Sequence, residues 1–202
     1  MMILFSSPPS PFGRKVKIVA ALLGLSDKIK IEATDTTDAG HPLRRHNPLG
    51  KIPALLLEDG TTLFDSRVIA EYLDHLAGGD RIIPREPKAR FAALRLQALC
   101  DGLLDAALLQ VYEARYRPDN IRHQPWLDHQ AGKVARSLDA LEQTSLALDA
   151  TPDIGQITLA CALGYLDLRF EGRWRAQYPK LVQWLDRFAA QVPAFAATKM
   201  PA

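Results

Sequence analysis

Residues 47–73 combine residue types that suit the binding of a small anionic ligand. They include a Lys-Ile-Pro tripeptide at 51–53 and the pair Asp65-Ser66. Apolar residues then recur with helical spacing, which predicts that Ser66 opens a helix with free backbone N–H groups pointing outward near Asp65 and Ser66. Such a helix terminus favours a carboxylate. The simpler interpretation is a Ser N-cap on a surface helix.

A predicted hairpin connects these two motifs. Residues 55–57 and 62–64 are short apolar runs, and Glu58-Asp59-Gly60 between them has turn chemistry with a glycine free to take positive φ. We therefore expect two paired strands that place the Lys-Ile-Pro and the helix start in one compact unit.

Ser10 and Pro11 mark a second helix start. A serine before a proline suits an N-cap, because the hydroxyl accepts an N–H bond and proline occupies a position that needs no donor. Apolar residues with helical spacing follow over 11–23, and Gly24 is well placed as the C-terminal cap. Off the apolar face of this helix are Arg14, Lys15 and Lys17.

The rest of the first part indicates a mixed sheet. Residues 3–6 and 29–31 are typical of strands, and residues 34–47 have no clear period and predict a loop with at most a short helix. The order βαβ followed by ββα suits a four-stranded mixed sheet with helices on its faces, the thioredoxin-like arrangement.

Everything after the first part is helical in pattern. Glycines and prolines break the periodicity near residue 80, so we expect an N-terminal domain over 1–78, a linker over 79–87 and an all-α domain over 88–202. Asp153 and Gln156 have the spacing of an N-cap and its partner. The fold class is therefore α+β, and the helices of the second domain are predicted at residues 89–116, 126–148, 157–169 and 181–191.

Composition excludes several classes of protein. Lys and Arg total 25 against 23 acidic residues, spread among one another, so a nucleic-acid partner is not expected. No apolar run is long enough to span a membrane, and the N-terminus lacks a secretory pattern, which predicts a cytoplasmic protein. Cys100 and Cys161 lie in apolar helical patterns without a CxxC motif, so they are expected to be buried and free.

Other catalytic constellations are weak. No GxSxG motif accompanies the histidines, which also lack metal-ligand spacing, so neither a serine hydrolase nor a metal site is expected. Asp101 and Asp105 are four residues apart on the long helix, where a partly exposed or interface face is favoured over a shared acid/base site.

Together these motifs resemble the soluble glutathione S-transferases over essentially the full length. The resemblance rests on residues 47–73, on Ser10-Pro11-Phe12 as the active turn, as in bacterial members, and on ITLACALGYLDLRF as the core helix of the second domain. The family more usually shows Ser/Thr-x-x-Asp where Asp153 and Gln156 stand, which changes the chemistry of that cap without obviously breaking it.

The resemblance implies a glutathione site. The backbone of Ile52 would pair with the cysteinyl part of the tripeptide, before Pro53, which is cis in the family. Asp65 and Ser66 would receive the γ-glutamyl end. Lys51 would bind the glycyl carboxylate or simply remain solvated.

The resemblance also gives Ser10 a role beyond capping, with Ser6 and Ser7 as nearby alternatives. Its hydroxyl would donate a hydrogen bond to the glutathione sulfur. Lowering a thiol pKa from ~8.5 to ~6.5 requires about 2.7 kcal/mol. A hydrogen bond to a charged group contributes about 1.5 to 3 kcal/mol and a helix terminus about 0.3 to 1 kcal/mol, so one hydroxyl nearly suffices.

The function that the resemblance implies is a glutathione transferase acting on small hydrophobic electrophiles, with glutathione as co-substrate. The resemblance also implies a homodimer, and we expect a role in detoxification. The electrophile pocket would lie near Tyr112 and Tyr116, although core packing is expected for at least one of them. Two alternatives remain open: a binding or regulatory protein with little turnover, and a glutathione-dependent isomerase or peroxidase.

Overall fold

The computed structural model describes residues 1–200, and its first part is a four-stranded sheet in the order β2-β1-β3-β4. Strand β1 (Met2–Ser6) pairs in parallel with β2 (Ile29–Ala33) and antiparallel with β3 (Ala54–Leu56). The last strand, β4 (Thr62–Leu63), pairs antiparallel with β3, and Gly60 in the turn between them has φ +88°. The mixed sheet and its hairpin are confirmed.

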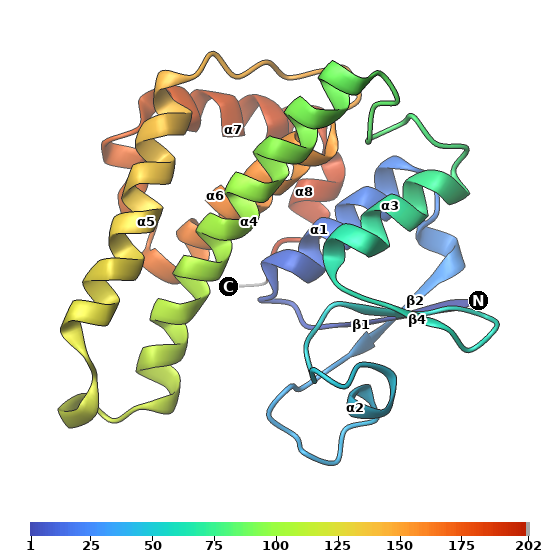
Figure 1. The fold of residues 1–202 in the computed structure, drawn as a ribbon. Coiled ribbons are helices and arrows are strands. Elements are labelled where there is room, and N and C mark those ends of the chain that lie inside the picture. The colour runs from blue at the N-terminus through green and yellow to red at the C-terminus, as the bar shows by residue number, and fades with distance from the viewer. Residues whose placement is uncertain (201–202) are drawn as a thin grey trace.

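Helices cover both faces of this sheet. Helices α1 (Pro11–Leu22) and α3 (Ser66–Leu76) lie together on one side, and the short α2 (Leu43–His46) lies on the other (Figure 1). Neighbouring residues of β1 supply the two cores, because successive side chains of a strand point to opposite faces. Leu4 belongs to the large core with α1 and α3, and Phe5 packs with Leu43 of α2.

The second part is helical, as predicted. It contains α4 (Pro87–Tyr116), α5 (Gln124–Gln143), α6 (Ile154–Phe170), α7 (Pro179–Gln191) and the unpredicted α8 (Pro193–Ala197) (Figure 1). Three short 3-10 turns complete the described elements: η1 (Ser26–Lys28), η2 (Asp119–Ile121) and η3 (Arg173–Ala176). None of the helices in this described part of the chain is long and apolar enough to cross a membrane.

The prediction that α5 continues to residue 148 was wrong. The helix ends at Gln143, and the carbonyl oxygen of Ala147 accepts hydrogen bonds from the side chains of Trp184 (2.9 Å) and Gln156 (3.2 Å). These contacts with α7 and α6 fix the segment after Gln143 as a loop, although its apolar residues continue a helical pattern.

Helix α6 is the centre of the second part, and its buried residues occur on every side. Its start is the predicted capping box, in which Asp153 accepts from the N–H of Gln156 and the Gln156 side chain accepts from the N–H of Asp153. Gly155, in the first turn of α6, allows a close crossing with α4, since a Cβ at this position would lie 2.6 Å from the carbonyl oxygen of Ala93.

The connector between α3 and α4 is held by hydrogen bonds at both ends. Asp74 accepts from the N–H groups of Arg81 (3.1 Å) and Ile82 (2.8 Å), and the carbonyl of Ile82 accepts from the N–H of Ile154 (2.8 Å). Helix α3 ends at Leu76 and α4 begins at Pro87, while the domain limits at 78 and 88 stay predictions.

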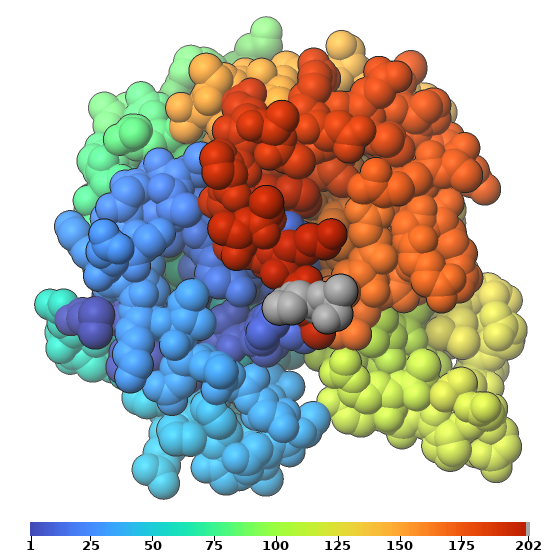
Figure 2. All heavy atoms as spheres, turned by 180° about the vertical axis from the view of Figure 1, so that it is seen from behind, coloured from blue at the N-terminus to red at the C-terminus, as the bar shows by residue number. Residues whose placement is uncertain are grey.

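Arg14 attaches the end of the chain to α1. Its buried guanidinium donates to the carbonyl of Phe195 and to Thr198 Oγ1 (3.3 Å), and it lies 3.9 Å from the centre of the Phe195 ring. Gly164 of α6 leaves the space for this contact, because a Cβ there would meet Arg14 Nη1 at 2.6 Å. Figure 2 shows the C-terminal segment lying over the first part of the chain.

Candidate ligand-binding site

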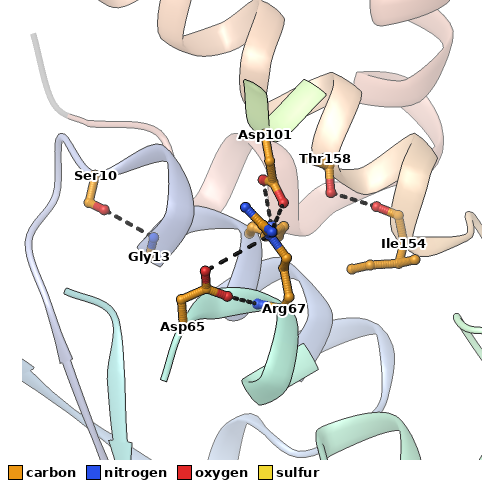
Figure 3. Close-up of polar contacts among 8 residues, drawn as sticks. Ser10, Gly13, Asp65, Arg67, Asp101, Ile154 and Thr158 are labelled. Atoms are coloured by element: carbon orange, nitrogen blue, oxygen red, sulfur yellow. Dashed lines mark hydrogen bonds and ion pairs between the residues drawn. The ribbon is translucent and has the colours of Figure 1, made fainter. Parts of the chain in front are cut away.

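Ser10 is the N-cap of α1, as the sequence predicts. Its backbone is extended, and its Oγ accepts from the N–H of Gly13 at 3.1 Å (Figure 3). A hydroxyl carries one donor as well as its acceptor lone pairs. Capping therefore uses Ser10 only as an acceptor and leaves its proton available for a ligand.

Ser6 and Ser7 are placed differently from Ser10. The Ser6 hydroxyl is buried without a hydrogen-bond partner among the described residues, and it lies against Gly13, where an added Cβ would be 2.1 Å from Ser6 Oγ. The carbonyl of Ser7 accepts from the N–H of Ser10 at 3.1 Å and so shapes the turn. Ser6 therefore faces the inner side of α1.

The Lys-Ile-Pro segment has a cis Ile52–Pro53 bond and a buried brace. Asn47 is buried, its Nδ2 donates to the carbonyl of Lys51 (2.8 Å), and its Oδ1 accepts from the N–H of Leu49 (3.1 Å). Sequence reasoning missed this role of Asn47. The signal was its position just before the Lys-Ile-Pro, where a short amide side chain can satisfy a neighbouring backbone.

The start of α3 is capped by Asp65 and not by Ser66. Asp65 Oδ1 accepts from the N–H of Arg67 at 2.8 Å, whereas Ser66 is the first residue of the helix and is buried. The expected helix start is thus found with its cap one residue earlier, because the Asp65 carboxylate is itself a good cap acceptor. Lys51 is exposed.

An ion-pair triad lies beneath this cap. Lys15 Nζ is 2.7 Å from Asp101 Oδ1, and Arg67 Nε is 3.1 Å from Asp101 Oδ2 (Figure 3). Lys15 and Asp101 are buried, whereas the Arg67 side chain is 54% exposed. The triad joins α1, α3 and α4. The sequence favoured a partly exposed or interface face for Asp101, and the structure places it at an interface between helices, where it is buried and not partly exposed. Sequence reasoning gave no sign of the burial of Lys15 and Arg14.

Asp105 follows Asp101 one turn later and is an exposed residue. Partial desolvation of its carboxyl raises the pKa of Asp105, the negative charge of Asp101 adds to the rise, and the positive charges of Arg67 and Lys51 oppose it. Asp105 therefore lies in the same electrostatic environment as Lys51 and the start of α3.

Tyr112 and Tyr116 lie further along α4, near its C-terminal end. Their rings meet edge to face with centroids 5.4 Å apart, and Tyr116 is 59% exposed while Tyr112 is partly buried. The expectation that at least one of them packs in the core was wrong. Partial burial, with the neighbouring Tyr116, raises the pKa of Tyr112.

Two other features lie apart from these residues. A hollow of about 540 Å³ is bordered by Met1, Lys28 and Glu58 and includes none of the candidate residues. Both cysteines are buried, and burial raises the pKa of Cys161 to about 11 and that of Cys100 well above its usual range. Within residues 1–200, no group of three or more His, Cys, Asp or Glu is placed to hold a metal ion.

Comparison with known proteins assigns both parts of the chain. Residues 9–76 match the model of the glutathione S-transferase N-terminal domain, and residues 124–187 match that of the C-terminal domain. An Escherichia coli K12 protein described as the uncharacterized GST-like protein YibF is 35% identical over 205 residues, which cover 99% of each chain. The chain belongs to the glutathione S-transferase family.

Solved structures of this family confirm the fold class. A glutathione transferase family member from Pseudomonas fluorescens Pf-5 is 40% identical, covers all of both chains with a TM-score of 0.94, and was crystallised with bound glutathione. A second structure from the same source, with a TM-score of 0.88 at the same identity and coverage, holds S-(propanoic acid)-glutathione. The thioredoxin-like first domain and the helical second domain of this transferase fold are therefore established.

Proposed function

We propose that this protein is a glutathione transferase that binds glutathione across the starts of α1 and α3 and activates its thiol. The observation that carries the proposal is the Ser10 cap, whose hydroxyl is occupied as an acceptor and free as a donor. Glutathione bound in a family member that is 40% identical over the whole chain supports the choice of ligand.

The proposed contacts follow the two capped helix starts. The Ile52 backbone pairs with the cysteinyl part of glutathione beside Pro53, and the brace from Asn47 supports that segment. Asp65 and Ser66 receive the γ-glutamyl end at the N-terminus of α3, where backbone N–H groups attract a carboxylate. Lys51 supplies a positive charge for the glycyl carboxylate.

The proposed chemistry leaves the protein unchanged. The Ser10 hydroxyl donates to the glutathione sulfur and stabilises the thiolate, the thiol proton leaves to solvent, and the thiolate attacks an electrophilic carbon held beside it. S-(propanoic acid)-glutathione in the Pseudomonas relative supports a site that accepts a substituent on the sulfur.

The test is calorimetric titration with glutathione followed by a thiolate absorbance scan against pH. Ser10→Ala should raise the pKa of the bound thiol by about one to two units, because a hydrogen bond to the charged sulfur is lost. Ser10→Thr keeps a hydroxyl and should restore most of the effect, and Ser7→Ala is the control. An unchanged thiolate titration in Ser10→Ala would refute the role of Ser10.

The same measurements separate the alternatives. Glutathione binding without conjugation of varied electrophiles would favour a binding or regulatory protein. Turnover of isomerisable or peroxide substrates would favour the isomerase or peroxidase.

The homodimer, the cytoplasmic location and the role in detoxification stay predictions. The homodimer is supported by exposed apolar residues on adjoining helices, since Val68 of α3 is 47% exposed and Phe91 of α4 is 68% exposed. An ion pair between Glu71 and Arg90 (2.7 Å) joins these helices nearby. Sedimentation equilibrium of the purified protein tests the assembly.

A further inference from the structure

One stripe of α4 continues from Asp101 along the second half of the helix. At 3.6 residues per turn, positions 101, 105, 112, 115 and 116 fall within an arc of about 100° around the helix axis. Asp101 proves the direction of this arc, because it pairs with Lys15 of α1 and Arg67 of α3. Tyr112, Arg115 and Tyr116 are therefore turned toward the first domain as well.

Arg115 lies across from the loop that follows β2. Hydrogen bonds from Thr37 hold the pKa of the exposed Asp35 below its usual value, and the positive charges of His41 and Arg115 lower it further. Figure 2 shows a notch between this loop region and the far end of α4. Arg115 thus belongs to the border of the cleft between the two domains.

Helix α6 brings a second arginine to the same place. Arg169 Cζ is 6.0 Å from the ring centre of the buried Tyr165, one turn earlier. Burial raises the pKa of Tyr165, and Tyr112 adds to the rise. The charge of Arg169, its side-chain hydrogen bond to Tyr165 and the charge of Arg115 oppose it. On α4, Arg115 Cζ lies 5.4 Å from the centre of the Tyr112 ring, which meets Tyr116, and both Tyr112 and Arg115 are near enough to act on Tyr165 of α6. These side chains form one cluster of two arginines and three tyrosines: Tyr112, Arg115, Tyr116, Tyr165 and Arg169.

The two arginines of this cluster lack ionic partners. Among the described residues, neither Arg115 nor Arg169 has a carboxylate oxygen within 4.0 Å. The Nε of Arg169 is in addition buried without a hydrogen-bond acceptor. A donor removed from water and left unpaired is unfavourable, and a shift of the Arg169 side chain toward the cleft would let a ligand oxygen satisfy it.

The cluster lies close to the helix that carries Ser10. Arg14 of α1 contacts Gly164, the residue before Tyr165, and Lys15 contacts Asp101 on the stripe that continues to Tyr112. The first turn of α1 therefore lies against both α4 and α6. A group attached to a sulfur at Ser10 would extend toward the cluster.

We propose that Arg115 and Arg169 form an anion subsite of the electrophile pocket, so that the preferred electrophiles are α,β-unsaturated carboxylates. This inference rests on the proposed function and names its substrate class, in place of the small hydrophobic electrophiles expected from the sequence. The two guanidinium groups hold the carboxylate, and the tyrosine rings pack against the carbon chain.

The reaction of such a substrate is a conjugate addition. The thiolate sulfur forms a bond to the β-carbon, the π electrons of the carbon–carbon double bond move toward the α-carbon and the carboxylate, and water protonates the α-carbon. No group leaves. Because negative charge grows on the carboxylate oxygens during the attack, guanidinium groups already placed there stabilise the transition state more than the ground state.

The test compares two conjugates of the same shape. S-(2-carboxyethyl)glutathione and its neutral amide, S-(2-carbamoylethyl)glutathione, are titrated calorimetrically into the full chain and into Arg115→Gln, Arg169→Gln and the double variant. Wild type should bind the carboxylate at least about tenfold more tightly than the amide, the effect of one or two charge-assisted hydrogen bonds. The double variant should bind both equally.

Matched controls separate an effect of the Arg115 and Arg169 charges from an effect of the overall charge of the protein. Arg173→Gln removes the same charge from an exposed residue paired with Glu171, and it should keep the full preference. Arg169→Lys should keep part of it. Unchanged affinity for glutathione itself in each variant shows that the variant is folded and that its tripeptide site is intact.

The outcomes are distinguishable from failure of the proposed function. Glutathione binding with no preference between the two conjugates, or a preference that survives in the double variant, overturns the anion subsite and leaves the transferase proposal standing. Absence of any binding by glutathione and by both conjugates overturns both proposals.

Discussion

The two ends of the domain-facing stripe of α4 treat charge in opposite ways. At the first end of the stripe, near the middle of α4, Asp101 is buried with Lys15 and joined to Arg67, so each charge has a partner supplied by the fold. Near its end, Arg115 faces the cleft without such a partner, and Arg169 joins it from α6. The buried ion pair of Lys15 and Asp101 joins the two domains, whereas the unpaired Arg115 and Arg169 at the cleft mark the position where we expect a ligand to bind.

The largest effect is expected from removal of the Asp101 carboxylate, which Lys15 and Arg67 share. Asp101→Asn should lower the free energy of unfolding by about 3 to 5 kcal/mol, because the buried Lys15 loses its partner. Urea denaturation measures the loss. The double variant Lys15→Met with Asp101→Leu should recover most of the lost stability, because no buried charge is left without a partner. If Asp101→Asn were as stable as wild type, the structural role of the triad would be contradicted.

A second prediction concerns the packing between α4 and α6. Gly155→Ala should destabilise the protein by about 1 to 3 kcal/mol, because its Cβ would meet the Ala93 carbonyl oxygen at 2.6 Å and Leu96 at 2.8 Å. Gly102→Ala is the matched control on exposed α4 surface, where nothing lies within 4 Å of the added Cβ. It should stabilise by about 0.5 to 1 kcal/mol through helix propensity. Thermal unfolding of the pair compares them directly.

A third, smaller effect depends on pH at Asp105, which lies between the two ends of the stripe. Its folded pKa is raised, chiefly by partial desolvation, so as pH rises the unfolded chain loses this proton before the folded one, and stability decreases through that window. Asp105→Asn cannot titrate. Its stability relative to wild type should therefore increase as pH rises above the ordinary Asp pKa of about 3.9, measured by urea unfolding at each pH. If the stability of Asp105→Asn relative to wild type decreased as pH rises, the raised pKa of Asp105 would be contradicted.

The smallest effect is expected at the unpaired end. Arg115→Gln should change the free energy of unfolding by no more than about 0.5 kcal/mol, because no ion pair of the fold is removed. Urea unfolding alongside Asp101→Asn makes the contrast quantitative. A loss as large as that of Asp101→Asn would mean that Arg115 serves the fold and not a ligand.

Features decided by neighbouring residues could be predicted from the sequence. The hairpin turn at Gly60, the cap at Ser10 and the capping box of Asp153 with Gln156 each depend on a few residues in a row, and all three are found. The four-stranded mixed sheet could be predicted because short connections leave few arrangements for such elements.

Features decided by distant contacts could not be predicted. The residues around Lys15 in the sequence do not indicate its partner Asp101, which lies 86 positions away. The end of α5 depends on the acceptor Ala147 meeting Trp184. The anion subsite joins Arg115 and Arg169 only after the rotations of α4 and α6 are fixed, and a single sequence does not contain those rotations.

The contacts of Arg14 with Phe195 and Thr198 matter for anyone who alters this protein. They join residues 195–198 to helix α1, whose N-cap is Ser10, so this segment supports the helix from behind. Shortened versions and fusions should keep residues 193–198, because their removal would take away the contacts that hold the Ser10 helix in place.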